Sequence, residues 1–428
     1  MKIHIKNFGT IKNAEVCIGG LTVIAGENDT GKSTIGKILF SLVKAFNKIE
    51  DDLLEDKHSK IMNVVETIYF TIRKSIPLSA ESDIKRTFFP PTFFEHILIH
   101  GEEAIYDRQS FLKILYSEGR IENSLFNFSL KQMAIIRSYL NESNDPAKAK
   151  IGAVRKAFYS EFRGDIVNKL TDENAKIEIN DGATLILSME WSKSELIKFD
   201  VNDDFSYDDS TYFDSSVVLQ FHHFIQGAKT LFDVGHSRNN GLMVPLHVKD
   251  LSRKLNESMY TIDLKEQNIN GADSDSIYGG DFYYDRDSKQ FLLSRNGLKY
   301  ASSNVASGIK NLGVFDMLVH GGHINNKTLT IIDEPEVNLH PDWQVKYAKS
   351  IALLAQTGAN IIVTTHSPYI IEALHLYSEK FEISPSFYQT NKVPNGVEFD
   401  DVTDELSKVI DKLSRPLEDL HREVDYDF

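Results

Sequence analysis

Hydrophobic and polar positions divide the chain into strand-like and helix-like stretches. Short apolar or alternating runs predict strands at Lys2–Ile5, Ile11–Ile18 and Leu21–Ala25. The same pattern predicts later strands over residues 176–180, 184–191, 196–201, 211–214, 282–284, 291–293, 329–332 and 360–364, with a final strand near residue 387. Apolar residues at helical spacing follow Ser33 and recur between several later strands, so we expect an α/β fold.

The middle of the chain differs in pattern from both ends. Helical segments from about residue 51 are interrupted by prolines, and no heptad repeat is sustained, so we expect no long coiled-coil arm. We therefore divide the chain into an N-terminal lobe (1–50), a mainly helical insertion (51–175), a β subdomain with helical and loop segments (176–300) and a C-terminal lobe (301–428).

Two further stretches have a distinct local pattern. Residues 233–242 are polar and rich in glycine, which predicts a mobile loop. Residues 404–423 have helical spacing, but Pro416 lies within them. Because proline removes a backbone hydrogen-bond donor and obstructs the preceding turn, we expect a break there.

Composition restricts the classes of function. The 428 residues allow two or three domains, or one domain with a large insertion, and the net charge of −15 excludes a nucleic-acid-binding field over the whole surface. A local basic groove remains open. The single Cys17 excludes a disulfide framework and a four-cysteine zinc site. There is no apolar stretch of about 18 residues and no signal-peptide core, so we expect a cytoplasmic protein that does not enter a membrane.

The most informative stretch is the glycine-containing segment that follows the apolar run Leu21–Ala25. It reads GENDTGKS and precedes a helical pattern, which is the strand–loop–helix context of a phosphate-binding loop. Backbone N–H groups of such a loop surround phosphate oxygens, Lys32 can reach the β- and γ-phosphates, and Ser33 can hold Mg²⁺. The predicted nucleotide-binding residues here are Gly26, Glu27, Asn28, Asp29, Thr30, Gly31, Lys32, Ser33 and Thr34.

Acidic residues and a histidine follow two later apolar strands. Asp333 and Glu334 end the run at 329–332, at the edge of a parallel sheet where ligands bind. We expect Asp333 to bind Mg²⁺ and Glu334 to deprotonate the attacking water. His366 follows the strand at 360–364. A lone histidine there is usually structural, but its order and spacing favour a contact with the γ-phosphate.

Other candidates are weaker. Ser307 and Gly308 begin a helix whose N–H groups could hold an anion, although serine and glycine before a helix are also ordinary capping residues. We expect this pair to complete the site of a second copy of the chain, and residues 336–340 to touch that copy. A glutamine after the strand at 211–214 could hold Mg²⁺, but Gln220 has the character of a surface residue.

Five segments carry a resemblance to a known family: IKNFGTIKNAEV, GENDTGKST, IIDEPEVNLHP, IIVTTHSPYII and the tail VEFDDVTDELSKVIDKLSRPLEDL. They resemble the ABC-type ATPases of the SMC and RecF kind, and more closely the compact bacterial AAA-type ATPases related to the ATPase half of OLD-family proteins. Such ATPases include the sensor subunits of the PARIS and Septu anti-phage systems. The resemblance covers about residues 1–46 and 302–428.

The resemblance implies an ABC-type ATPase head with a RecA-like core, an antiparallel β subdomain and a helical insertion. It implies ATP and Mg²⁺ as cofactors, a homodimer or higher homo-oligomer, a separate effector subunit such as a nuclease, and a nucleic acid or phage protein as trigger. Asp29 replaces a glycine that transporter loops prefer, and Ser307-Gly308 lacks the full LSGGQ string, so slow turnover is expected.

Three alternatives are weighed against this switch. A RecF-like repair ATPase that clamps DNA would need a basic surface, against which the net charge argues mildly. A self-contained nuclease would need an acidic cluster on its own sheet, and the tail after His366 is too short for one. The DEPEVNLHP string and the long insertion differ from the nucleotide domains of transporters.

Overall fold

The computed structural model describes residues 1–47, 49–75, 82–142, 145–226, 244–258, 277–285 and 287–426. The chain divides into two compact units, one formed by residues 1–47 and 151–428 and the other by residues 48–150. The predicted loop at 233–242 lies outside the described residues. None of the described helices has the length and apolar character needed to cross a membrane.

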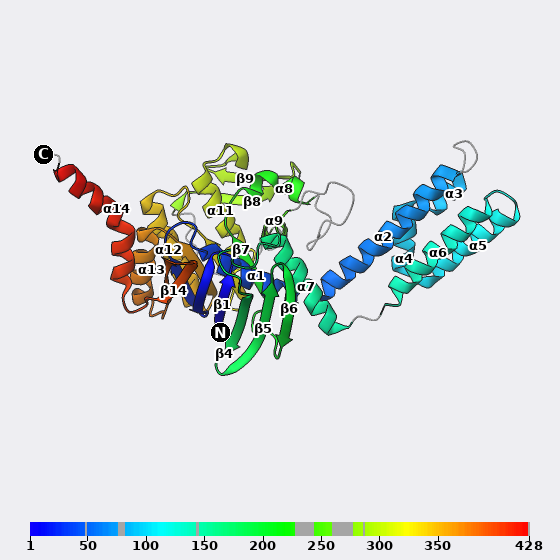
Figure 1. Cartoon of the computed structure of the whole chain (residues 1–428). Helices are drawn as coiled ribbons and strands as arrows, with labels where there is room; N and C mark the ends of the chain where they lie inside the picture. The colour runs from blue at the N-terminus through cyan, green and yellow to red at the C-terminus, as the bar shows by residue number, and fades with distance from the viewer. Residues whose placement is uncertain are drawn as a thin grey trace. The chain divides into compact units, whose positions relative to one another are not determined.

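The larger unit is organised around an 11-stranded sheet formed by described residues, with the order β6-β5-β4-β1-β2-β14-β13-β3-β12-β11-β7 (Figure 1). Its strands are β1 (Lys2–Phe8), β2 (Ile11–Cys17), β3 (Leu21–Ala25), β4 (Ala175–Asp181), β5 (Thr184–Ser192), β6 (Glu195–Val201), β7 (Asp209–Phe213), β11 (Thr328–Asp333), β12 (Asn360–Thr365), β13 (Ser386–Val393) and β14 (Gly396–Asp401).

One half of this sheet is parallel. β13, β3, β12, β11 and β7 pair in parallel, with Val23 opposite Val363 and Ile332 opposite Phe213. β3 and β11 are buried along their whole lengths, as expected for strands covered by helices on both faces. Parallel pairing brings the carboxyl ends of β3, β11, β12 and β7 to one edge, where the predicted site residues lie.

Helices surround the parallel strands. α1 (Lys32–Asn47) packs closely on one face, because a Cβ at Gly36 would lie 2.7 Å from Ile331 and 3.1 Å from Tyr212. A large apolar core lies between the strands and the remaining helices. Those helices are α8 (Val218–Gln226), α9 (Leu246–Glu257), α11 (Ser307–His320), α12 (Pro341–Gln356), α13 (Pro368–Lys380) and α14 (Leu406–Tyr426).

The other half of the sheet is mostly antiparallel. β6, β5, β4, β1 and β2 form a meander-like antiparallel region, as the alternating patterns predicted. A separate sheet is formed by β8 (Asp281–Asp285), β9 (Gln290–Arg295) and β10 (Leu298–Ala301), and it is followed by the 3-10 helix η2 (Ser302–Asn304). The predicted α/β fold with an antiparallel β region is confirmed.

The smaller unit consists of helices with their own apolar core, and Phe88, Met133 and Ile136 are fully buried in it. Its helices are α2 (Ile49–Ser75), α3 (Ser82–Thr87), α4 (Pro90–His100), α5 (Glu102–Ser117) and α6 (Asn123–Leu140). α7 (Pro146–Phe162) begins in this unit and continues into the larger one. Helices of this length, packed around one core, explain why the sequence showed mixed helical spacing without heptads.

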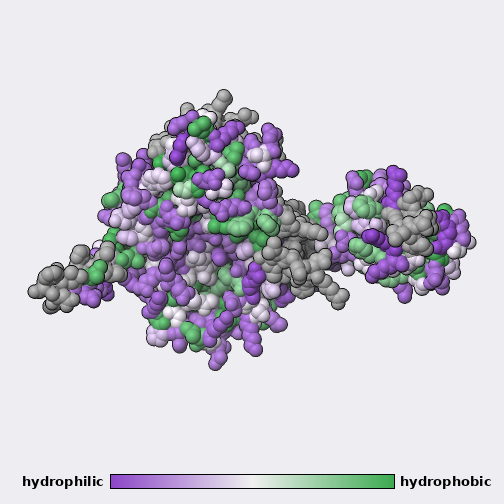
Figure 2. Space-filling view, turned by 90° about the horizontal axis from the view of Figure 1, so that it is seen from above, coloured by the Kyte–Doolittle hydropathy of each residue, from purple (hydrophilic) through white to green (hydrophobic). Residues whose placement is uncertain are grey.

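Two sequence predictions about the C-terminal region were wrong. α14 continues through Pro416, where a break was expected. A proline removes only one hydrogen bond of the helix ladder, and α14 holds its first turns on the core through Leu406 and Val409. β14 was not predicted as a strand; it pairs with β13 through antiparallel contacts. Figure 2 shows that the upper face of the larger unit is mainly hydrophilic, with small scattered hydrophobic areas.

Candidate functional site

The predicted phosphate loop joins β3 to α1. Its backbone bends through positive φ angles at Gly26, Asp29 and Gly31, of 155°, 60° and 77°. Lys32 is buried and donates hydrogen bonds to the carbonyls of Gly26 at 2.9 Å and Glu27 at 2.6 Å. Burial lowers the pKa of Lys32, while nearby acids, Glu334 first, act to raise it. The ammonium group is therefore held inside the loop by carbonyl oxygens. It can exchange these partners for phosphate oxygens when a nucleotide binds.

The end of β13 supports this loop. The Thr390 hydroxyl donates to the Thr30 hydroxyl at 2.7 Å, and a Cβ added at Gly26 would overlap the Thr390 side chain. Lys392 forms an ion pair with Glu27 at 3.2 Å on the exposed side. Glycine is thus required at position 26 by a close approach as well as by backbone conformation.

Asp333 lies beside the first turn of α1. Its Oδ1 accepts a hydrogen bond from the Ser33 hydroxyl at 2.9 Å, and its Oδ2 accepts one from the Tyr212 hydroxyl at 2.7 Å. The Thr364 hydroxyl also donates to Oδ1. Three hydroxyl donors keep this carboxylate oriented.

A hydroxyl and a carboxylate in contact are a suitable donor set for Mg²⁺, which prefers oxygen and is commonly bound by one or two carboxylates and by phosphates. Among the described residues there is no group of three His, Cys, Asp or Glu that could hold a metal by itself. The residues Ser33 and Asp333 fit a magnesium ion that is shared with nucleotide phosphates.

Glu334 directly follows β11, His366 directly follows β12, and the Glu336 side chain lies beside His366. Glu334 has a φ of 52°, and its amide donates to the Thr364 carbonyl at 2.9 Å. His366 Nδ1 lies 3.1 Å from Glu336 Oε1 and 3.7 Å from Glu334 Oε1. His366 is 40% exposed and Glu334 35%, so both can meet a ligand.

Glu336 was not predicted as a site residue. Its side chain is buried, and Oε1 accepts hydrogen bonds from the Thr365 hydroxyl at 2.8 Å and the His366 amide at 2.7 Å. That residues 336–340 touch a second copy stays a prediction, but the Glu336 side chain itself is buried within its own chain. It instead fixes the turn that carries His366 within the same chain.

Ser307 and Gly308 begin α11 at a separate place. Ser307 is exposed, and Gly308 packs so tightly that an added Cβ would lie 2.5 Å from the Asn338 carbonyl. The Asn311 amide donates to the Val337 carbonyl at 3.1 Å. Neither Ser307 nor Gly308 is among the described residues that line the cavity beside the phosphate loop. The start of α11 is thus joined to the segment after Glu336, outside the chain's own cavity.

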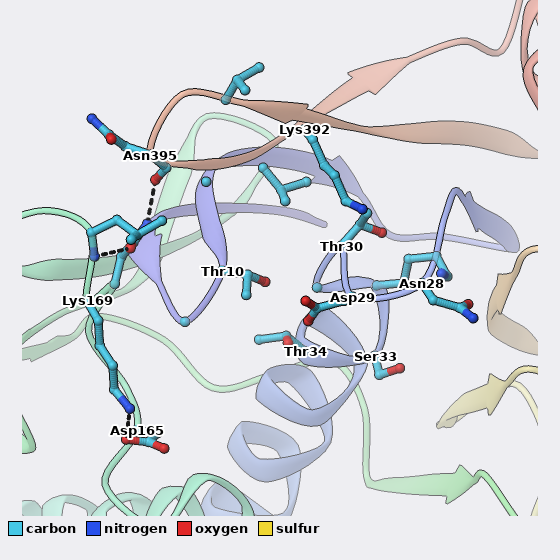
Figure 3. A pocket seen from close by; sticks show the side chains of 18 of the residues that line it. Thr10, Asn28, Asp29, Thr30, Ser33, Thr34, Asp165, Lys169, Lys392 and Asn395 are labelled. Carbon is cyan, nitrogen blue, oxygen red and sulfur yellow. Dashed lines mark hydrogen bonds and ion pairs between the residues drawn. The ribbon is translucent and has the colours of Figure 1, made fainter.

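A cavity of about 840 Å³ opens beside the phosphate loop (Figure 3). Its volume is in the range of small-molecule sites. The lining residues come from the loop and α1, from two hairpin turns and from the segment after α7; they are Gly9, Thr10, Asn28, Asp29, Thr30, Gly31, Lys32, Ser33, Thr34, Asp165, Val167, Asn168, Lys169, Leu170, Glu334, Lys392, Val393, Asn395, Gly396 and Val397.

The walls of this cavity are joined by hydrogen bonds. The Asn168 side chain donates to the Asn395 carbonyl at 2.9 Å, and its amide donates to the Asn7 carbonyl at 2.9 Å. Asp165 and Lys169 form an ion pair at 2.8 Å near the rim, as Figure 3 shows. Sequence analysis missed these residues, because segments so distant in the chain carry no common motif. Their place next to the loop is suited to the part of a nucleotide beyond its phosphates.

Comparison with known proteins shows the family of the chain. A family model described as the AAA ATPase domain matches residues 1–371. The chain belongs to that family. The matched residues include the phosphate loop, the acidic strand end and His366, and membership indicates a nucleotide-dependent ATPase. No curated protein matches the sequence.

Solved structures that are similar to this AAA ATPase domain protein include three SMC heads, each at low sequence identity. The SMC head domain from Thermotoga maritima has 10% sequence identity to this chain and a TM-score of 0.39. The match covers 94% of this chain and 98% of the SMC head chain. An SmcHead bound to the C-winged helix domain of ScpA has 9% identity, coverages of 95% and 98%, and a TM-score of 0.38. An Smc head from Pyrococcus furiosus with an extended coiled coil, bound to the C-terminal domain of ScpA, has 9% identity, coverages of 98% and 98%, and a TM-score of 0.33.

Proposed function

We propose that this protein is an ATP-binding and ATP-hydrolysing switch that dimerises around its nucleotides. The observation that carries the proposal is the contact of Ser33 with Asp333, 2.9 Å apart, beside the buried Lys32. Residues 300 positions apart are brought together in the arrangement that a magnesium nucleotide needs. Glu334 and His366 stand on the open side, where a γ-phosphate would lie.

The roles of the residues follow from their atoms. The loop N–H groups and Lys32 Nζ would bind phosphate oxygens, while Ser33 and Asp333 would hold a magnesium ion. Bound Mg²⁺ would neutralise charge on the phosphates. The Glu334 carboxylate accepts a proton from the attacking water, and His366 donates a hydrogen bond toward the γ-phosphate. Glu336 maintains the position of His366 through its contact with the His366 amide.

The position of Ser307 supports the dimer. The exposed N-terminus of α11 offers backbone N–H groups that its own cavity does not use. In a two-fold dimer each copy can present this end to the γ-phosphate held by the other. ATP would then join the two copies, and hydrolysis would release them.

The effector is proposed from the family resemblance. ATPases of this group act as sensor subunits in anti-phage systems, so we propose that the dimer controls a separate nuclease subunit in bacterial defence. A nucleic acid or a phage protein would be the trigger. A nuclease gene adjacent to this gene would support this role, whereas neighbouring recombination genes and salt-dependent binding of duplex DNA would favour a DNA clamp instead.

The variant Glu334→Gln tests hydrolysis. We expect it to bind ATP with nearly unchanged affinity and to lose turnover by at least about 100-fold, because the general base is removed and the phosphate contacts are kept. Glu372→Gln, an exposed residue of α13, is the matched control and should hydrolyse ATP normally. Calorimetry measures binding and phosphate release measures turnover. Full hydrolysis by Glu334→Gln would reject Glu334 as the base.

The dimer is tested by light scattering on the Glu334→Gln protein with and without ATP. We expect a doubled mass only with magnesium and ATP. Adding Ser307→Arg should abolish the doubling while ATP binding remains, whereas Ser303→Arg, also exposed, should have no effect. A Glu334→Gln protein that binds ATP but stays monomeric in all conditions would contradict the dimer.

A further inference from the structure

The first polar residue after β7 is an aspartate, Asp214, at the edge where the magnesium site lies. β7 is the parallel neighbour of β11, and Phe213 is the register partner of Ile332. Continuing the register by one residue places Asp214 at the level of Asp333. Gln220, the glutamine that was considered as a magnesium ligand after this strand, is exposed on α8.

Asp214 is also on the α1 side of the sheet. Tyr212, two residues earlier and therefore on the same face of the strand, donates its hydroxyl to Asp333 Oδ2 at 2.7 Å. α1 covers this face, as the close approach of Gly36 to Ile331 and Tyr212 shows. The charge of Lys37, one turn after Ser33 on α1, acts on the Asp214 carboxylate.

Two buried side chains from other elements fix this carboxylate. Asp214 Oδ2 lies 3.3 Å from His247 Nε2, and His247 Nδ1 lies 2.7 Å from Glu161 Oε2. Glu161 also accepts the backbone N–H of His247 at 2.9 Å. The side chains of Glu161 and His247 are 0% and 4% exposed, whereas Asp214 is 35% exposed. The series Glu161–His247–Asp214 therefore runs from two buried side chains to a partly exposed carboxylate.

We propose that Asp214 is a further residue of the magnesium–nucleotide site, where its carboxylate accepts hydrogen bonds from water bound to the metal. His247 and Glu161 are the positioning residues that hold it there. This inference rests on the proposed function, because it assigns a residue to the same site. It follows from the strand register, the shared face with Tyr212 and Asp333, and the fixed, accessible carboxylate.

The test measures the binding of a non-hydrolysable ATP analogue by calorimetry, with Mg²⁺ and with chelator, in the full chain. Asp214→Asn should weaken binding in Mg²⁺ about tenfold and leave binding in chelator unchanged, since outer partners of a metal site typically contribute 10- to 100-fold. Asp208→Asn, at the opposite end of β7 and 68% exposed, is the matched control and should behave as the wild type. Asp333→Asn is the positive control.

Glu161→Gln and His247→Asn should reduce the magnesium-dependent affinity in the same direction by a smaller factor. An unchanged Asp214→Asn protein beside a weakened Asp333→Asn protein would overturn the inference and leave the proposed function standing. Equal losses in Mg²⁺ and in chelator would also overturn it, because Asp214 would then support the loop and not the metal. A wild type that binds no analogue in either condition would instead reject the proposed function.

Discussion

Glu336 determines the position of His366, although it lies outside the residues that a nucleotide would touch. One carboxylate oxygen receives both the Thr365 hydroxyl and the His366 amide. Such a contact fixes a backbone turn, because each donor would lose a buried acceptor if the turn moved. From the sequence alone, Glu336 was assigned to a segment that touches a second copy, because an acid after Pro335 is typical of an exposed turn.

The pair of variants Glu336→Ala and Glu336→Gln tests this role. Alanine removes the acceptor, so we expect turnover to fall by about 100-fold, the order of effect of a misplaced catalytic group, while ATP affinity changes little. Glutamine keeps a carbonyl oxygen at the same place and should retain most activity. Steady-state ATPase assays with calorimetric ATP binding compare the two. If both variants hydrolyse ATP as fast as the wild type, the turn is fixed without Glu336.

At the residue scale, sequence motifs could place Lys32, Ser33, Asp333, Glu334 and His366 because each follows an apolar strand in a fixed order. The residues around them could not be predicted in this way. Tyr212 and Glu161 carry no motif, and their roles depend on contacts with residues 121 and 86 positions away. A buried acid such as Glu161 is indistinguishable in sequence from the exposed acids of a helix surface.

At the level of elements, His247 joins three parts of the larger unit. Its imidazole on α9 faces Glu161 from α7, Asp214 from the end of β7 and the Tyr212 ring, whose centroid is 5.0 Å away. Burial alone would lower the pKa of His247, but hydrogen bonds to Asp214 and Glu161 raise it to about 9. The charged imidazolium therefore stabilises the packing of these elements.

This pKa predicts how stability depends on pH. Because the pKa of His247 is raised in the folded state, the charged imidazole contributes fully to the free energy of unfolding below the unfolded-state pKa of about 6.5. This contribution is lost as the pH rises through about 9. The shift corresponds to about 3 kcal/mol of unfolding free energy. Urea denaturation of the wild type at pH values between 6 and 10 should show this loss. The His247→Asn protein should be less stable at pH 6.5 and show a flatter profile.

His375→Asn serves as the control for this profile. His375 is on α13 and 39% exposed, so its replacement should leave the pH dependence as in the wild type. An equally steep profile in the His247→Asn protein would assign the pH dependence to other groups.

Elements were predictable to the extent that their signals are local. The apolar run of β3, the glycine loop and the helical spacing of α1 identified one another, and β11 and β12 were equally clear. β14 was missed because Gly396–Asp401 is short and partly acidic, and its strand state depends on pairing with β13 and β2. The effect of Pro416 was overestimated because helix propensity is a local measure, whereas the anchoring of α14 is tertiary.

For the whole molecule, the order of strands was beyond prediction from sequence. β14 and β13 from the C-terminal region separate β2 from β3, although β2 and β3 are neighbours in the chain. This arrangement places the turn between β13 and β14 against the phosphate loop and completes the cavity wall. Sheet order depends on contacts between distant segments, which hydrophobic periodicity does not encode.

The division into two units leads to a prediction about the chain as a whole. All residues that line the nucleotide cavity belong to residues 1–47 and 151–428, and the smaller unit has its own core. Replacing residues 49–149 by a flexible glycine-serine linker of about 15 residues should therefore leave ATP affinity within about threefold of the full chain. Calorimetry measures the affinity, and thermal melting followed by circular dichroism shows whether the shortened chain folds.

Residues 48–150 produced alone should melt cooperatively, because their apolar side chains pack mainly on one another. The shortened chain with Lys32→Ala is the control for specific binding and should bind no ATP. If the shortened chain folds but has lost ATP binding, the smaller unit must contribute to the nucleotide site. If it binds ATP as the full chain does, the helical unit is free to serve the partner or trigger, and any loss of effector control in that protein can be assigned to it.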